Sequence, residues 1–301
     1  MPPTFPDPLP PSDLSLDVTI RFHDPARLDE LGRAVFSAAL SDHQPLAIQV
    51  ACQRFDLPAL QAVHDTLAPI LEIAGDIPLQ VLNRPDPTPI DARAALLNLG
   101  LRAGQGRYAA FLDYDDLIYP EAYRLLVAEL EATSAAVAFG GILNAYVSRD
   151  GLVPITTAKR RVFQGEGLAR LLYDNFCPLH SFVVDRHRIA PQDLVVDETL
   201  CTLEDYDLLL RLVAKYPSSF RLKDKIVGEY LFKDDDSNIN PLARAGRPKI
   251  APTAEWAAAE ADLTHRKATL LLSPVVQSAL GLDEPGLTVA AFLARQPTLG
   301  Y

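Results

Sequence analysis

Three carboxylates follow a short apolar segment in the middle of the chain. Residues 109–112 read Ala-Ala-Phe-Leu, and Asp113, Asp115 and Asp116 come directly after them. Like charges at this spacing repel one another and are costly to bury, so a chain that keeps them together usually provides a cation. Carboxylate oxygens suit Mg²⁺ or Mn²⁺, ions that are often shared with the phosphates of a substrate. The simpler alternative is an acidic turn in which one carboxylate caps the helix expected after Pro120.

A second acidic group lies at the start of a predicted helix, in the sequence Glu204-Asp205-Tyr206-Asp207. Acidic side chains favour the first turn of a helix, where the helix dipole is positive, so this cluster alone is consistent with a structural role. Together with the first cluster it indicates a division of labour, in which one carboxylate binds a metal ion and another acts as a general base.

The scaffold for both clusters is predicted to be an α/β fold. Strands and helices alternate from Asp17 onward, which indicates a mainly parallel open sheet with helices on both faces. The predicted strands are 18–22, 46–52, 79–82, 108–112, 135–139 and 182–185. The predicted helices are 27–40, 57–71, 92–102, 121–132, 167–173, 204–215, 254–272 and 275–280. Ligands of such folds bind outside the carboxyl ends of the strands, where the first acidic cluster would lie.

Composition narrows the classes of protein. The 301 residues suffice for one large domain with an extension, and the hydrophobic (49%) and charged (22%) fractions are those of ordinary globular proteins. The net charge of −11 argues against a nucleic-acid partner. Three scattered cysteines fit a reducing compartment. Because no apolar run could span a membrane, we expect a cytoplasmic protein, peripheral at most to the inner face of a membrane.

The chain is expected to have three parts: a Pro-rich flexible lead-in over 1–16, the α/β domain over 17–250 and a helical extension over 251–301. Residues 233–252 are predicted to form a loop at the end of the domain. One face of the first extension helix is expected to be buried, and its residues are Ala257, Ala258, Ala261, Thr264, Ala268 and Leu271. We therefore expect the extension to dock on the domain, or to mediate homo-oligomer or larger assembly, rather than to carry chemistry.

The order of these motifs resembles the family 2 glycosyltransferases of GT-A fold. The resemblance covers roughly residues 17–240, and its segments are Asn98-Leu99-Gly100-Leu101, Gly106-Arg107-Tyr108, Phe111-Leu112-Asp113-Tyr114-Asp115-Asp116 and Glu204-Asp205. It implies a GT-A-like sheet flanked by helices. It also implies an inverting transfer of a sugar, from a nucleotide-diphosphate donor, a UDP-sugar first, to a hydroxyl of a glycan or glycolipid acceptor. The implied cofactor is Mn²⁺ or Mg²⁺.

The resemblance assigns roles to the carboxylates. Asp113 would contact the ribose or base of the nucleotide, and Asp115 would coordinate the divalent ion that bridges the diphosphate. Asp205 would be the base that deprotonates the acceptor hydroxyl, with Glu204 beside it. The chemistry needs these groups because the departing nucleoside diphosphate gains negative charge and the attacking hydroxyl must lose its proton.

Four other positions are candidates for ligand contacts. Gln53 could hydrogen-bond the nucleobase, and Arg93 stands one helical turn before the usual place of a family arginine. His180 could contact the diphosphate or acceptor, or be a hydrogen-bonded core histidine. The basic run 159–161 could form a mobile lid over phosphates or a solvated loop.

Two alternative functions stay open. A haloacid-dehalogenase-type phosphatase also has an apolar strand that ends in Asp-x-Asp, but that motif usually opens its domain, and here three predicted strands precede it. A non-catalytic sugar-nucleotide-binding or scaffold module would explain why the base-reading turn of the family is replaced by Cys52-Gln53-Arg54-Phe55-Asp56.

Overall fold

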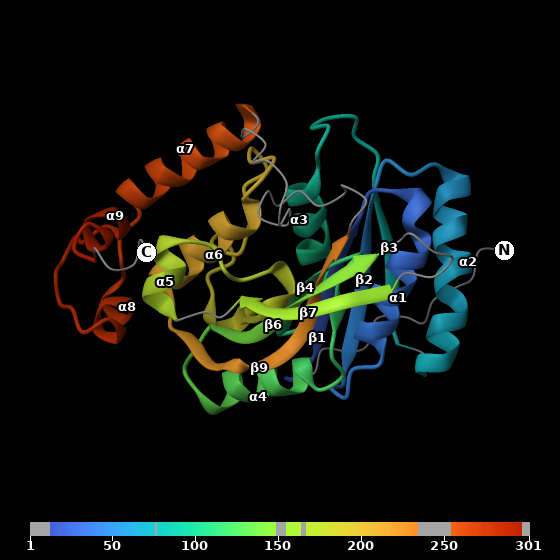
Figure 1. The fold of residues 1–301 in the computed structure, drawn as a ribbon, viewed down its shortest axis with the longest axis horizontal. Coiled ribbons are helices and arrows are strands. Elements are labelled where there is room, and N and C mark those ends of the chain that lie inside the picture. The colour runs from blue at the N-terminus through green and yellow to red at the C-terminus, as the bar shows by residue number, and fades with distance from the viewer. Residues whose placement is uncertain (1–12, 76, 149–154, 164–166, 234–253, 297–301) are drawn as a thin grey trace.

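One twisted sheet forms the centre of the computed structural model, which describes residues 13–75, 77–148, 155–163, 167–233 and 254–296 (Figure 1). Its strand order is β3-β2-β1-β4-β8-β6-β9-β5, and β7 pairs with β6. The strands are β1 (Leu16–Phe22), β2 (Leu46–Gln53), β3 (Leu79–Arg84), β4 (Tyr108–Asp113), β5 (Leu117–Ile118), β6 (Val137–Ser148), β7 (Ile155–Phe163), β8 (Phe182–Asp185) and β9 (Ser218–Lys233). The predicted Pro-rich lead-in, up to residue 12, and the predicted loop, beyond residue 233, lie outside the described residues.

Helices cover both faces of the sheet, which confirms the predicted α/β class. They are α1 (Leu28–Ala39), α2 (Leu57–Ala74), α3 (Arg93–Ala103), α4 (Ala122–Ala132), α5 (Leu168–Tyr173), α6 (Glu204–Lys215), α7 (Ala254–Thr269), α8 (Pro274–Ala279) and α9 (Val289–Leu293). Helices α1, α2 and α4 share one apolar core with the sheet, and α3, α5 and α6 share a second core with the extension. In the described part of the chain, no helix combines the length and the apolar character that crossing a membrane requires.

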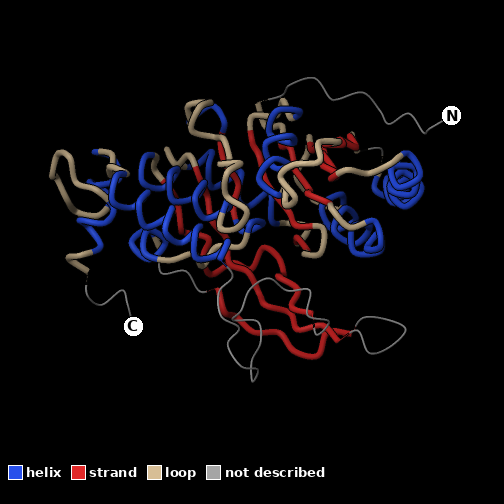
Figure 2. Tube along the Cα trace, turned by 90° about the horizontal axis from the view of Figure 1, so that it is seen from above, coloured by secondary structure: helices blue, strands red, loops and turns tan. Residues whose placement is uncertain are grey.

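The sheet is more mixed than the expected mainly parallel one. Strands β3, β2, β1 and β4 are parallel, whereas β8 runs antiparallel to both β4 and β6. Strand β6 is much longer than the strand predicted over 135–139, and β9 was not predicted. With β7 these strands form a ribbon that projects from the body (Figure 2). The loop predicted over 159–161 is therefore wrong, because these residues lie in β7, and the lid over phosphates stays a prediction. Exposed strands tolerate charged side chains, so their sequence lacks the apolar signal of a core strand.

Close packing of α3 on β1 sets the position of one pocket wall. A Cβ atom built on Gly100 of α3 would lie 2.2 Å from Cγ2 of Thr19 in β1. No side chain fits at this distance, so glycine lets the helix lie directly on the strand. The first residue of α3, Arg93, is thereby held at the edge where the parallel strands end.

The C-terminal extension docks on the α/β domain through a different face from the predicted one. The predicted small-residue stripe of α7 is exposed, whereas Ala259 and Leu263 are buried. A leucine side chain buries more apolar area than any single alanine of the stripe. Arg266, on the buried side, adds ion pairs to Asp207 (2.7 Å) and Asp197 (2.8 Å), so the helix turns this face inward.

We predict that Phe292→Ala lowers the free energy of unfolding by about 3–5 kcal/mol, because the side chain is only 3% exposed within the core shared by α9 and α6. Leu271→Ala, at a side chain that is 55% exposed, should change it by less than about 0.5 kcal/mol. Urea unfolding followed by circular dichroism measures both. Equal, small losses would mean that the extension does not belong to the folded core.

Candidate active site

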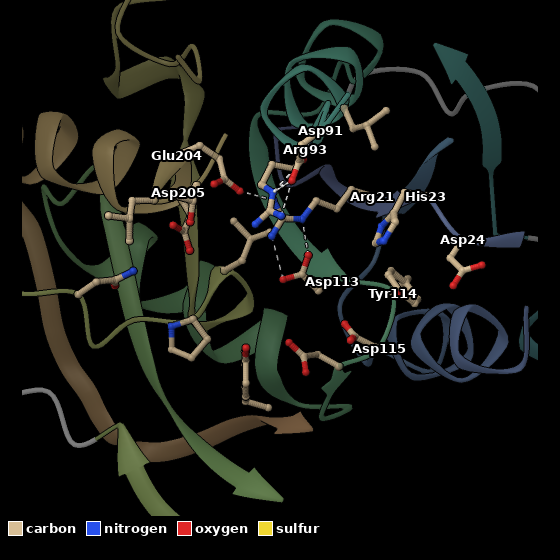
Figure 3. Close-up of a pocket in the computed structure, with 18 of the residues that line it drawn as sticks. Arg21, His23, Asp24, Asp91, Arg93, Asp113, Tyr114, Asp115, Glu204 and Asp205 are labelled. Atoms are coloured by element: carbon tan, nitrogen blue, oxygen red, sulfur yellow. Dashed lines mark hydrogen bonds and ion pairs between the residues drawn. The ribbon is translucent and has the colours of Figure 1, made fainter. Parts of the chain in front are cut away.

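The two acidic clusters meet in one pocket at the carboxyl ends of β1, β2 and β4 (Figure 3). The pocket has a volume of about 640 Å³, within the range of small-molecule sites. Its walls come from the segment after β1, the start of α3, the turn 113–116 and the start of α6. This is where an open α/β sheet binds its ligands, as the sequence predicts.

The pocket lining carries more negative than positive charge. Among the described residues, eight carboxylates and three guanidinium groups line it. The carboxylates belong to Asp24, Asp91, Asp113, Asp115, Asp116, Asp174, Glu204 and Asp205, and the guanidinium groups to Arg21, Arg27 and Arg93. A phosphorylated ligand is repelled by such a surplus unless a cation enters with it.

The guanidinium of Arg21 joins the two acidic clusters. Its Nε and Nη2 donate to the two carboxylate oxygens of Asp113, the second at 3.1 Å, and its Nη1 donates to Oε1 of Glu204. Parallel pairing of β1 with β4 sets Arg21 directly beside Asp113. Burial alone lowers the pKa of Arg21, but the two carboxylates raise it overall. Burial raises the pKa of Asp113, and the charge of Arg21 more than reverses this, so Asp113 is ionised.

Lys233, the last described residue of β9, lies against the proposed metal ligand. Its Nζ is 2.5 Å from Oδ2 of Asp115 and 2.9 Å from Oε2 of Glu30, and its side chain is 3% exposed. The Asp115 carboxylate is itself 29% exposed and lines the pocket. Burial and the charge of Asp113 raise the pKa of Asp115 despite the lysine. A second cation near Asp115 would therefore stabilise its ionised form.

The third carboxylate of the first cluster has a structural role. Asp116 is 2% exposed and accepts a hydrogen bond from the amide of Leu231 at 2.9 Å, which ties the turn to β9. His180 lies behind it, with Nδ1 3.3 Å from Oδ2 of Asp116. Burial lowers the pKa of His180 to about 4, so the ring is neutral at pH 7. The side chain of His180 is fully buried and does not reach the pocket surface.

The second acidic cluster sits at the first turn of α6, after Leu203 in a left-handed conformation (φ 59°). Asn98 in α3 fixes the preceding segment, because its amide donates to the carbonyl of Val196 and accepts from the Val196 amide, both at 2.8 Å. Burial and the neighbouring charge of Glu204 raise the pKa of Asp205 to about 7. A carboxylate with this pKa is well suited to act as a general base near neutral pH.

Two of the predicted donor contacts line the pocket but already have partners. The Gln53 amide donates to the carbonyl of Ile90 at 2.9 Å and accepts from the amide of Ala92 at 3.0 Å. Arg93 is paired with Asp91, at 2.5 Å for Nη2. Gln53 thus supports the wall of the pocket, and a hydrogen bond to a nucleobase would have to replace one of these bonds.

Three residues at or directly behind the pocket escape sequence reasoning. Arg21 could have been found from the alignment of parallel strand ends, since it lies opposite Asp113 on the neighbouring strand. Lys233 is the last residue of a strand that no apolar run predicts, so the apolar pattern does not locate it near Asp115, which it contacts from behind the pocket lining. Trp256 lies in the extension yet lines the pocket, and only the three-dimensional docking of α7 brings it there.

One sequence family matches part of the chain. Residues 69–189 match the family model described as Glycosyl transferase family 2. This segment contains Asp113 and Asp115 and ends before Glu204. At the level of sequence, no curated protein matches the chain.

Solved structures share the fold at low identity. TarS of S. aureus superposes with a TM-score of 0.57 and 14% identity, over 87% of this chain and 41% of TarS. A TarS fragment in complex with UDP-GlcNAc superposes with a TM-score of 0.54 and 14% identity, over 87% of this chain and 68% of the fragment. The mannosyltransferase PcManGT from Pyrobaculum calidifontis was solved with GDP-Man and Mn²⁺. It superposes with a TM-score of 0.52 and 14% identity, over 94% of this chain and 79% of PcManGT. The chain therefore spans less than half the length of TarS.

We predict that Arg21→Met lowers the free energy of unfolding by about 3–5 kcal/mol, because it leaves the Asp113 and Glu204 carboxylates buried without their cation. Arg102→Met is the matched control, since the Arg102 side chain is 65% exposed and 3.9 Å from its partner, and should change stability by less than about 0.5 kcal/mol. Urea unfolding compares the two. If both variants were equally stable, the ion pairs of Arg21 would not contribute to the free energy of unfolding.

Proposed function

Because this chain belongs to glycosyltransferase family 2 and has the GT-A fold, we propose that its pocket transfers a sugar from a nucleoside-diphosphate donor to a hydroxyl acceptor. One observation carries the proposal: Asp113 and Asp115 share a pocket with Asp205, whose pKa of about 7 suits a general base. Arg21 lies between the two groups, so that one side of the pocket is left for the donor and the other for the acceptor.

The donor class is a nucleotide sugar, with a UDP-sugar as the first candidate. TarS has been solved with UDP and with UDP-GlcNAc, and the Pyrobaculum enzyme with GDP-Man, which supports this class and makes GDP-sugars the second candidate. We propose a glycan or glycolipid precursor as acceptor, because this is what the family resemblance implies, and a cytoplasmic setting, on the composition of the chain. Assembly through the C-terminal helices stays a prediction.

A divalent ion is the proposed cofactor, and the donor side fits one. In the described part of the chain, no set of three or more side chains could hold an ion alone, so diphosphate oxygens and water would complete the coordination, as is usual for Mg²⁺. Asp115 is the candidate ligand because it is partly exposed to the pocket and because burial and the charge of Asp113 raise its pKa despite the contact with Lys233, so that a further cation would stabilise its ionised form. When bound, Mn²⁺ or Mg²⁺ neutralises the charge that develops on the departing diphosphate.

The acceptor side supplies the base. Asp205 takes the proton from the acceptor hydroxyl as the oxygen forms a bond to the anomeric carbon. The bond between that carbon and the diphosphate oxygen breaks, and its electron pair leaves with the nucleoside diphosphate. A single displacement of this kind inverts the anomeric configuration, which is the stereochemistry that we propose.

The phosphatase alternative receives no support from the first carboxylate. Asp113 is held by two nitrogen atoms of Arg21, and its pKa is lowered. Both oxygens of this carboxylate therefore accept hydrogen bonds from Arg21, and neither is free to attack a phosphorus atom. The non-catalytic alternative keeps the same pocket, and the binding and turnover experiments below separate it from an enzyme.

We predict that the wild-type protein binds UDP or GDP in Mn²⁺ at least about tenfold more tightly than in EDTA, because the acidic lining repels a diphosphate that brings no cation. Asp115→Asn should remove most of this gain, since it deletes a charge from the ion site. Isothermal titration calorimetry measures both, with the exposed Asp262→Asn as control. Absence of any binding, with or without metal, would reject the proposed function.

We predict that Asp205→Asn lowers kcat by about 10²–10⁴-fold and leaves the dissociation constant of the donor within about twofold. For the wild type, kcat/KM should rise as the pH increases through about 7, because only the ionised carboxylate accepts a proton. The variant should lose this rise. Release of the nucleoside diphosphate, with an acceptor panel or with water, reports turnover. Full turnover by the variant would transfer the role of base to Glu204 or Asp207.

A further inference from the structure

The only tryptophan of the chain, Trp256, belongs to the C-terminal extension and yet lines the same pocket as Glu204 and Asp205. It lies in the first turn of α7, and the rest of that helix packs on the side of the pocket formed by α5 and α6 (Figure 1). The extension therefore contributes a large aromatic surface to the pocket, and its helix is anchored on the elements that carry Glu204 and Asp205.

Several contacts hold α7 in this position. Arg266 forms ion pairs with Asp207 in α6 and with Asp197, at 2.7 and 2.8 Å. Nζ of Lys267 donates to the carbonyl of Tyr173 at 2.6 Å, and Leu263 is buried in the core shared with α6. Asp207 is in the first turn of α6, like the proposed base, so the helix that carries the tryptophan is tied directly to the helix that carries Asp205.

The chemistry of the indole group indicates what it binds. Its Nε1 donates to Oε1 of Glu260, one turn further along the same helix, at 2.9 Å. With this donor already used, Trp256 contributes ring surface to the pocket rather than a hydrogen bond. Aromatic rings combine apolar area with a negatively charged face, which suits the C–H groups on one side of a sugar ring.

Polar groups that could hold the hydroxyls of such a sugar line the same side. Asp174 and Asn175, which follow α5, are pocket residues, and the Asp174 side chain is 61% exposed. A pocket that combines an aromatic surface with a few directed polar groups is typical of small-molecule sites. The nucleobase, which is also flat and apolar, is the less suitable occupant, because Asp115, the candidate metal ligand for the donor, lies on the other side of the Arg21 guanidinium from Glu204 and Asp205 (Figure 3).

We propose that Trp256 is the stacking platform for a sugar residue of the acceptor, with Asp174 and Asn175 beside it, so that the C-terminal extension forms part of the acceptor site. This inference rests on the proposed sugar transfer. It also revises our expectation that the extension takes no part in the site.

Because Trp256 is the sole tryptophan, the emission of the wild-type protein reports on this position alone when it is excited at a wavelength that the ten tyrosines do not absorb. Methyl glycosides and short oligosaccharides of glucose, mannose and N-acetylglucosamine serve as probes, without nucleotide and then with UDP and Mn²⁺. We expect at least one sugar to change the emission with a saturating dependence on concentration. If no sugar does so under either condition, the platform does not exist.

Trp256→Ala should raise the KM for a working acceptor about tenfold and leave the dissociation constant of UDP or GDP within about twofold. Trp256→Phe, which retains a ring, should restore most of the loss and control for folding. Tyr173→Ala, at an exposed aromatic residue outside the pocket lining, should change neither constant. An acceptor KM that is the same in Trp256→Ala and the wild type overturns the assignment.

The remaining outcomes separate this inference from the proposed function. Weakened nucleotide binding in Trp256→Ala would mean that the ring stacks on the base of the donor, which overturns the acceptor assignment. If calorimetry finds no nucleotide binding to the wild type, sugar transfer fails, whereas a saturating change of emission with sugar alone would still establish a carbohydrate site at Trp256.

Discussion

The ion pair network of Arg21 is the interaction on which the architecture of the pocket depends. The guanidinium connects Asp113, at the end of a central strand, with Glu204, at the start of a helix that is remote in sequence. Both carboxylates would be costly to bury alone. Arg93 adds a second positive charge nearby, but among the described residues only Arg21 is bonded to both carboxylates. The distance between the donor and acceptor sides of the pocket is thus set by one side chain with a planar, forked charge, a geometry that lysine would not reproduce.

Charge neutralisation explains why carboxylates of one pocket behave differently. Burial raises the pKa of both Asp113 and Asp205, but the pKa of Asp113 ends below its ordinary value and that of Asp205 rises to about 7. The difference is the partner, because Arg21 bonds Asp113 directly, whereas the nearest strong influence on Asp205 is the like charge of Glu204. The protein thereby obtains a permanently ionised group and a proton acceptor from the same residue type. The excess of carboxylates also makes the empty pocket unfavourable for an anion, so cation and nucleotide depend on each other.

Sequence patterns predicted the part of the fold in which local signals and burial coincide. Apolar runs and turns located the parallel strands, and the acidic clusters, now found in one pocket, were recognised because carboxylates rarely follow buried strands without a reason. Strand β6 was predicted only over 135–139, and strands β9 and β7 were missed, since their many charged and polar side chains read as loop. The stripe on α7 was wrong because helical spacing identifies a face of small residues without deciding whether a larger leucine and an arginine on another face bury more favourably. Trp256 reaches the pocket, and Lys233 reaches the Asp115 carboxylate, only through tertiary packing, which no spacing in the sequence encodes.

The contact between Gly100 and Thr19 has a consequence for how homologous sequences can vary. A Cβ atom at position 100 would lie 2.8 Å from the Cβ of Thr19 as well as 2.2 Å from its Cγ2, so even an alanine in the strand would not make room for one in the helix. A substitution at position 100 must therefore be accompanied by a substitution at position 19. A homologue with a larger residue at 100 must have glycine at 19 or hold the helix farther from the sheet. In the second case the start of that helix, and with it the arginine at position 93, moves outward and the pocket becomes wider. The identity of one small residue, remote from the chemistry, would then distinguish homologues with narrow sites from homologues with wide ones.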